Sequence, residues 1–178
     1  MRRVAIPDPS LVVLVGAAGA GKTTFAARHF DPSDVLSSDG YRALVSGDEA
    51  DQGATRAAFG RLHRELARRL AQGRLTVIDA TNVERSARRA LVSRSAAAGL
   101  PAVAIVLDLP APMVFARNAA RTGRIVDERA ISHHLARLGE TLDESTARLE
   151  AEGFSQVVIL RDPHEVDAVR IVRRPAGL

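Results

Sequence analysis

The feature that most constrains this chain is a glycine-rich loop that directly follows a run of apolar residues. Leu11–Val15 reads LVVLV and leads into Gly16-Ala-Ala-Gly-Ala-Gly21-Lys22-Thr23. This is the pattern G-x-x-x-x-G-K-[ST], in which glycines let backbone N–H groups turn inward towards phosphate oxygens. A helix that begins after such a loop adds the positive end of its dipole. The segment therefore predicts a phosphate-binding loop between a strand and a helix.

The side chains of this loop predict how a nucleoside triphosphate is held. Lys22 can reach the β- and γ-phosphates, and the Thr23 hydroxyl can ligate Mg²⁺. Lys22 is the single lysine among 25 basic residues, the others all being arginine. We expect ATP or another NTP, together with Mg²⁺, as cofactors. The expected binding positions are Gly16, Gly19, Ala20, Gly21, Lys22, Thr23 and Thr24.

Composition limits the class of protein further. The chain has 178 residues, of which 46% are hydrophobic, and it contains no cysteine. We expect one domain over residues 1–178, in the cytoplasm, without disulfides, thiolate metal sites or a membrane span. The net charge of +4 and the many arginines suit an anionic partner. Aromatic residues, at 3%, are too scarce for extensive stacking along a single strand.

The order of apolar runs predicts the fold class. Runs rich in Val, Ile and Leu without polar alternation are typical of strands buried on both faces of a parallel sheet. We expect strands at 11–15, 35–37, 75–78, 102–107 and 156–160, with a possible sixth at 169–172. Helical spacing predicts helices at 23–29, 54–71, 83–98, 112–121 and 128–152. The alternation indicates an α/β sheet with helices on both faces, and residues 173–178 look like a frayed end or the beginning of a linker.

Ligands of such folds bind at the carboxyl ends of the strands, so the residues that follow each strand are candidates for the site. After the second strand, Asp39 is placed to orient an attacking hydroxyl and take its proton, and Arg42 to hold a phosphate of the acceptor. Asp39 as a helix cap and Arg42 as a surface residue are equally compatible with this position. After the third strand, Asp79 sits where a Walker-B carboxylate holds Mg²⁺ or its water. A capping role for Thr81 or Asn82 on the next helix is the alternative.

Arginines in the second half of the chain predict a lid. Arg117 and Arg121 are four residues apart and would share one helical face, with Arg124 in the connection after Gly123. Such a group could close on a triphosphate and neutralise transition-state charge, although a solvated basic face is the commoner explanation of an arginine pair. Two further arginine clusters are expected to be solvated faces, with contact to nucleic acid phosphates as the less common alternative. They are Arg61, Arg64, Arg68 and Arg69 on one helix, and Arg85, Arg88 and Arg89 on another. His133 and His134 are adjacent on a helix, hence about 100° apart, which is poor geometry for a shared metal.

Taken in order, these motifs resemble the kinase module of bacterial polynucleotide kinase-phosphatase, an RNA end-repair enzyme. The resemblance spans nearly the whole chain, and the order and spacing of its pieces are more specific than any piece after the loop. The pieces are Gly16–Thr24, residues 35–39 with Arg42, 48–52, Ala58-Phe59, 73–82 with Arg88, Arg117-Asn118-x-x-Arg121-x-x-Arg124, and Glu152-Gly-Phe154.

The resemblance implies a fold and an activity. The fold is that of P-loop NTPases of the nucleoside-monophosphate-kinase type, a five-stranded parallel sheet of order 2-3-1-4-5 with a helical lid. The activity is transfer of the γ-phosphate of an NTP to the 5′-OH of RNA or DNA. By this resemblance Asp39 is the general base and Arg42 supports the acceptor. The donor phosphates are bound by Lys22, Arg117, Arg121 and Arg124, and Mg²⁺ is bound by Thr23. Family proteins usually continue into phosphatase and nucleotidyltransferase modules, which are expected as linked partners.

Two other functions fit the same loop. A small-molecule kinase would use this machinery on the hydroxyl of a sugar, nucleoside or antibiotic. A nucleotide-dependent switch would need no acceptor chemistry, but a guanine-specific N-K-x-D motif cannot occur here because the only lysine lies in the loop.

Overall fold

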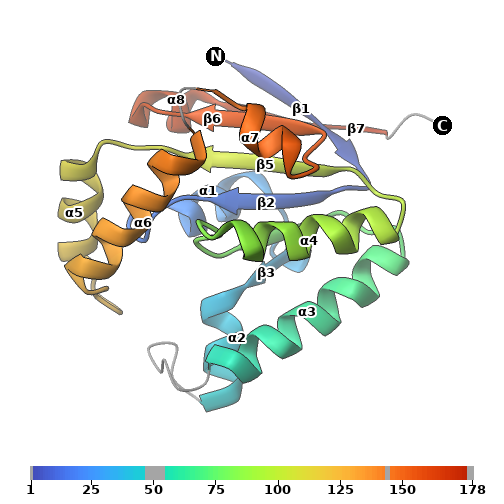
Figure 1. Ribbon diagram of the computed structural model, residues 1–178, viewed down its shortest axis with the longest axis horizontal. Coiled ribbons are helices and arrows are strands. Elements are labelled where there is room, and N and C mark those ends of the chain that lie inside the picture. Colours follow the sequence, from blue (N-terminus) through green and yellow to red (C-terminus); the bar gives the residue numbers. More distant parts are fainter. Residues whose placement is uncertain (1, 47–54, 143–144, 176–178) are drawn as a thin grey trace.

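The loop follows the central strand of a five-stranded parallel sheet, several strands of which run across the middle of Figure 1. The computed structural model describes residues 2–46, 55–142 and 145–175. The strands of this sheet are β2 (Leu11–Val15), β3 (Val35–Ser37), β4 (Thr76–Asp79), β5 (Ala102–Leu107) and β6 (Gln156–Leu160). They lie in the order β3-β4-β2-β5-β6, so the predicted order 2-3-1-4-5 is confirmed. Every residue of β2, β4 and β5 is buried, as the apolar runs predicted.

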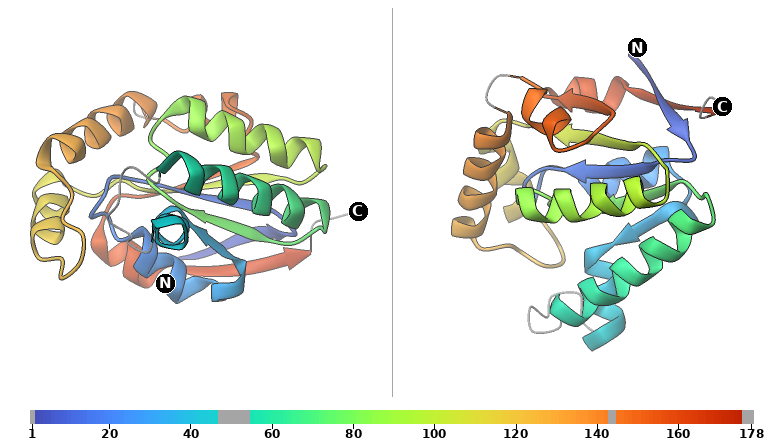
Figure 2. Two further views of the ribbon diagram at one scale, coloured as in Figure 1. Left: turned by 90° about the horizontal axis from the view of Figure 1, so that it is seen from below. Right: turned by 45° about the vertical axis from the view of Figure 1, so that its right-hand side comes forward.

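Helices cover both faces of this sheet. In the order of the chain they are α1 (Lys22–His29), the 3₁₀ turn η1 (Pro32–Asp34), α2 (Ser38–Ser46), α3 (Thr55–Ala71), α4 (Arg85–Ala97), α5 (Ala111–Ala119), α6 (Glu128–Leu142), α7 (Ala147–Ala151) and α8 (Pro163–Ala168). Figure 2 shows α3 and α4 on one face of the sheet and α1 with α8 on the other. Each face has its own apolar cluster, built on alternate residues of β2: Val12 and Leu14 face α1, and Leu11, Val13 and Val15 face α3 and α4. The α/β fold with two covered faces is confirmed.

The two ends of the chain form a separate two-stranded sheet. β1 (Arg3–Asp8) pairs in parallel with β7 (Arg170–Pro175), with Arg3 opposite Arg170. The possible sixth strand therefore exists but does not join the main sheet, and residues 173–175 are part of a strand instead of a frayed end. β1 was missed because Pro7, Asp8 and Pro9 interrupt its apolar run. Its buried residues, Val4 and Ile6, alternate with more exposed ones, which is the pattern of a strand with one covered face.

Several predicted boundaries were wrong. The helix predicted over 128–152 is two helices, α6 and α7, and the one predicted over 112–121 ends at Ala119. The short helices α2 and α8 were not predicted. The piece of the resemblance at 48–52 lies outside the described residues. Within the described part of the chain, no helix is long and apolar enough to cross a membrane.

The α5–α6 hairpin, which comprises α5, α6 and the connection 120–127, lies beyond the end of the sheet to which β2 and β5 point (Figure 1). It thus stands beside the loop that follows β2. α6 packs within this fold, because its residues Ile131, Leu138 and Leu142 are buried in the two apolar clusters.

Candidate functional site

A cleft of about 620 Å³ opens at the carboxyl ends of the strands. Its walls come from the loop after β2, the beginning of α2, the end of β4, the α5–α6 hairpin and α8. Six cationic side chains line it, namely Lys22, Arg28, Arg42, Arg117, Arg121 and Arg124. Three carboxylates line it too, those of Asp39, Asp79 and Asp167. The excess of positive charge makes this cleft suited to an anionic ligand.

The loop between β2 and α1 needs glycine for two different reasons. Gly19 has φ +90°, and a Cβ there would lie 2.7 Å from the carbonyl oxygen of Val114 on α5. Gly21, with φ +93°, caps the beginning of α1. Gly19, Ala20, Gly21, Lys22, Thr23 and Thr24 all line the cleft. Gly16, the first residue of the loop, does not line the cleft. Its N–H donates to the carbonyl of Thr81 over 2.9 Å.

Lys22 is folded back over its own loop. Its Nζ donates to the carbonyl oxygens of Gly16 at 2.9 Å and Ala17 at 2.8 Å. The residue is buried, and this burial lowers the pKa of the ammonium to about 8; the carboxylate of Asp79 acts in the opposite direction and Arg121 adds to the lowering. The ammonium thus lies in the cleft with little contact to water. A bound anion would favour its charged form and so offset the effect of burial.

Thr23 and Asp79 provide oxygen atoms next to each other. The Thr23 hydroxyl donates to Oδ2 of Asp79 over 2.7 Å, and Asp79 is buried at the end of β4. A hydroxyl and a carboxylate at the edge of an anion-binding cleft are ligands of the kind that Mg²⁺ prefers. These residues therefore fit the metal that the loop implies. The capping alternative for Thr81 and Asn82 was wrong, because α4 begins after Glu84 and the Asn82 side chain donates to the carbonyl of Leu14.

Asp39 and Arg42 face the loop from the first turns of α2. Arg42 forms an ion pair with Oδ1 of Asp39, and Nη1 of Arg124 lies 3.6 Å from the same oxygen. Arg42 is 7% exposed, so its interpretation as a surface residue was wrong. A carboxylate is thus held between a buried guanidinium and an arginine of the α5–α6 hairpin, in the same cleft as Lys22.

The three arginines of the α5–α6 hairpin all line the cleft, but one lies on a helix and two lie in the connection that follows it. Arg117 lies on α5, and its Nη1 donates to the carbonyl of Ala20 over 3.5 Å. Arg121 lies after the end of α5, so the prediction that it shares a helical face with Arg117 was wrong. Its Nη1 donates to the carbonyl of Arg124 over 3.4 Å. Burial lowers the pKa of Arg124, with Arg121 as a second cause.

Two residues of the α5–α6 hairpin were missed by the sequence reasoning. His134 of α6 lines the cleft, and its Nδ1 accepts from the N–H of Ala18 over 3.4 Å. Burial, followed by the charge of Lys22, lowers the pKa of His134, which favours the neutral ring that this bond requires. Asn118 is buried and makes two bonds to the backbone of Val126, at 2.8 and 3.0 Å, so it fixes the connection that carries Arg121 and Arg124.

The comparison with protein families gives one match that spans most of the chain: the AAA domain family, over residues 11–144. This interval contains the loop, α2, β4 and the α5–α6 hairpin, and the fold is that of a P-loop NTPase of the kinase type. No curated protein sequence matches the chain.

Solved structures are similar in fold. A chain of the Pnkp1/Rnl/Hen1 RNA repair complex gives a TM-score of 0.66 at 23% identity, covering 78% of this chain and 47% of its own length. A chain of the PezAT chromosomal toxin–antitoxin system of Streptococcus pneumoniae gives 0.64 at 14% identity, covering 89% and 69%. A sugar kinase from Janibacter gives 0.56 at 19% identity, covering 89% and 90%. The chain thus spans about half of the first of these structures, and the likeness concerns the fold alone.

Proposed function

The chain belongs to the AAA domain family, and from this premise we propose that it is a polynucleotide 5′-hydroxyl kinase. It transfers the γ-phosphate of ATP or another NTP to the 5′-OH end of RNA or DNA. Residues 1–178 act as one kinase domain in the cytoplasm, with nucleic acid ends as the partner. In RNA end repair, linked phosphatase and nucleotidyltransferase modules would act on the same ends.

One observation carries this proposal: a carboxylate and a buried arginine lie together in the cleft that the loop also lines. Asp39 is the proton acceptor for the attacking hydroxyl, and Arg42 holds a phosphodiester of the acceptor strand. A guanidinium matches phosphate geometry closely, so Arg42 is suited both to orienting the carboxylate of Asp39, with which it pairs, and to contacting a phosphate of the acceptor. The positive cleft therefore favours a polyanionic acceptor.

The donor is held by the loop and by the α5–α6 hairpin. Backbone N–H groups of the loop and Lys22 bind its phosphates, while Arg117, Arg121 and Arg124 close over them. Thr23 and Asp79 would hold Mg²⁺, which when bound neutralises charge on the β- and γ-phosphate oxygens. Arg124 lines the cleft with the loop and lies 3.6 Å from Asp39, so it would join the two halves of the site.

The transfer is a single displacement in which positioning does most of the work. The 5′-hydroxyl oxygen forms a bond to the γ-phosphorus, and the bond from that phosphorus to the β–γ bridging oxygen breaks, which releases ADP. Asp39 accepts the hydroxyl proton. The arginines of the α5–α6 hairpin take the charge that develops on the transferred group.

A small-molecule kinase is the second candidate. The sugar kinase from Janibacter is matched over 90% of its length, whereas the RNA repair chain is matched over 47%. Acceptor-stimulated release of ADP separates the two functions. We expect stimulation by a single-stranded 5′-OH oligonucleotide, steeply weakened by salt because several phosphates are contacted, and none by gluconate or glucose. Stimulation by a sugar alone would favour the second candidate, and Lys22→Met is the inactive control.

A further inference from the structure

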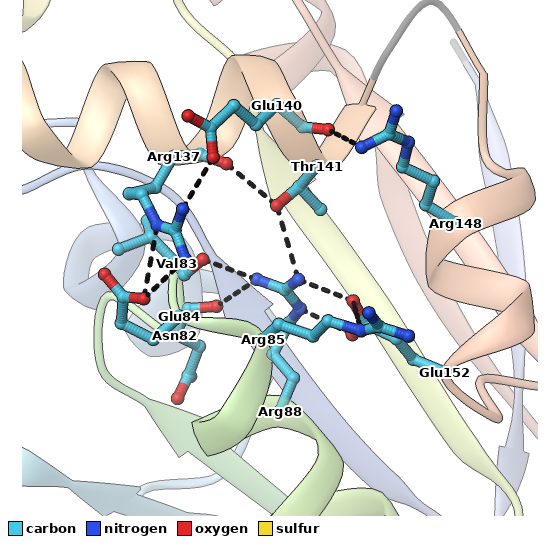
Figure 3. Close-up of polar contacts among 10 residues, drawn as sticks. All are labelled: Asn82, Val83, Glu84, Arg85, Arg88, Arg137, Glu140, Thr141, Arg148 and Glu152. Carbon is cyan, nitrogen blue, oxygen red and sulfur yellow. Dashed lines mark hydrogen bonds and ion pairs between the residues drawn. The ribbon is translucent and has the colours of Figure 1, made fainter.

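A buried ion pair lies behind the loop, outside the cleft. Arg88 of α4 is 1% exposed, and the side chain of Glu152, just after α7, is 3% exposed. Nε and Nη2 of Arg88 donate to the two carboxylate oxygens of Glu152 over 2.8 and 2.7 Å (Figure 3). The expectation that Arg88 belongs to a solvated face was therefore wrong. Because burying two charges costs much of what their attraction returns, such a pair is weak evidence for stability and needs another explanation.

The other donors of Arg88 reach backbone and side-chain oxygens of two more segments. Nη1 donates to the carbonyls of Asn82 at 3.0 Å and Val83 at 2.7 Å, and Nη2 donates to Oγ1 of Thr141 on α6 at 3.3 Å. With the two bonds to Glu152, all five N–H donors of the guanidinium are used (Figure 3). Lysine, with three donors and no planar fork, could not replace this arrangement.

The segment that Arg88 holds in turn holds the beginning of the phosphate-binding loop. The carbonyl of Thr81 accepts from the N–H of Gly16 over 2.9 Å. Nδ2 of Asn82 donates to the carbonyl of Leu14 over 2.7 Å, and Asn82 itself has φ +49°, a left-handed conformation that asparagine tolerates better than most residues. The backbone at 81–83 is thus the link between Arg88 and Gly16.

The same segment is tied to α6 by a second set of contacts. Glu84 accepts from Arg137 over 3.1 Å and contacts His133 over 2.9 Å. His134, which directly follows His133, accepts from the N–H of Ala18 in the loop. The network around Arg88 therefore sets the positions of the loop and of the α5–α6 hairpin relative to each other.

We propose that Arg88 is a positioning residue for the triphosphate site, acting through the backbone of 81–83 and paired with Glu152 for that purpose. This inference rests on the donor site of the proposed function and is independent of the acceptor. It predicts that removal of the pair weakens binding of the donor more than it weakens the fold.

The double variant Arg88→Met/Glu152→Met tests this inference. A single substitution would leave one charge buried and unpaired, whereas removal of both by apolar side chains of similar size keeps the fold stable in comparable cases. The matched control is Arg85→Met on the same helix, since Arg85 is 65% exposed and its Nε lies 3.9 Å from Glu152. For each variant, the thermal midpoint without ligand and the Kd for Mg·ATP are measured by calorimetry.

We expect the double variant to melt lower than the unaltered chain, because the carbonyls of Asn82 and Val83 lose their donor, but to stay folded. We expect it to bind Mg·ATP about 10-fold more weakly or worse, as supporting residues behind a site commonly do. The control should match the unaltered chain in both quantities. An unchanged Kd in the double variant would overturn the inference. If the double variant does not fold, Arg88→Lys decides by the same measurement, with a weakened Kd expected and an unchanged Kd overturning. Absence of Mg·ATP binding by the unaltered chain would overturn the proposed function, and this inference with it.

Discussion

At the scale of single residues, the acceptor half of the site depends on Asp39. Asp39→Asn keeps the shape of the side chain but removes its capacity to take the hydroxyl proton. We expect kcat for phosphate transfer to fall about 10²–10⁴-fold, the usual contribution of a general base, with the Kd for Mg·ATP unchanged. Asp34→Asn, which alters a carboxylate outside the cleft paired with Arg173, is the control. Full transfer activity of Asp39→Asn would show that the base is assigned wrongly.

The donor half has a pH dependence that Lys22 controls. In the free protein burial lowers the pKa of its ammonium to about 8, and a bound triphosphate favours the charged form. Below pH 8 the ammonium is already protonated, so affinity for Mg·ATP is flat. Above it, binding must take up a proton, and affinity falls by up to about tenfold per pH unit. Calorimetry in buffers of different ionisation enthalpy measures that uptake. Equal affinity and no proton uptake on both sides of pH 8 would contradict this account.

Which residues the sequence could reveal depends on how local their signal is. Lys22 and Thr23 follow from a contiguous motif, and Asp79 from its place at the end of a strand. His134 meets Ala18 across 116 residues of chain, and no local pattern encodes that contact. Arg88 did leave a signal: it stands three and four residues before Leu91 and Val92, on the buried stripe of α4. The charge of Arg88 favoured a solvated face, whereas its helical spacing indicated the buried face of α4.

Among the elements of the site, the α5–α6 hairpin depends on Asn118, which fixes the connection between its two helices. Asn118→Ala removes both bonds to the backbone of Val126 and leaves buried polar groups without partners. We expect a loss of about 1–3 kcal/mol in the free energy of unfolding. We also expect a higher KM for ATP, because Arg121 and Arg124 lose their fixed position. Urea unfolding and steady-state kinetics measure the two effects, with exposed Arg129→Ala as control. A KM equal to that of the unaltered chain would mean that the hairpin does not act on the donor.

The ends of elements were less predictable than their existence. The apolar spacing over 128–152 suggested one continuous helix. In the structure a new helix, α7, begins after its cap residue Thr146, and Oγ of Ser145 accepts from the N–H of Ala147. Similarly, the turn after α5 depends on Asn118 reaching Val126, a contact across eight residues that helical periodicity does not describe.

At the scale of the whole molecule, the sheet order followed from the family resemblance, while the pairing of the chain ends did not. Apolar runs buried on both faces identify the five central strands without reference to tertiary contacts. β1 and β7 lie at opposite ends of the sequence and are half exposed, so each is recognisable only beside the other. The positive cleft could not be predicted from local sequence for the same reason. Its arginines come from α1, α2 and the α5–α6 hairpin, which are brought together only by the fold.

Phosphorylation of polynucleotide ends in this cleft is tested by following the γ-phosphate itself. Mg·ATP labelled at that position is incubated with the chain and a short RNA or DNA strand bearing a 5′-OH, beside the same strands already 5′-phosphorylated. We expect label on the 5′-OH strands only, and none with Lys22→Met. Binding of ATP without labelling of any strand would contradict this expectation.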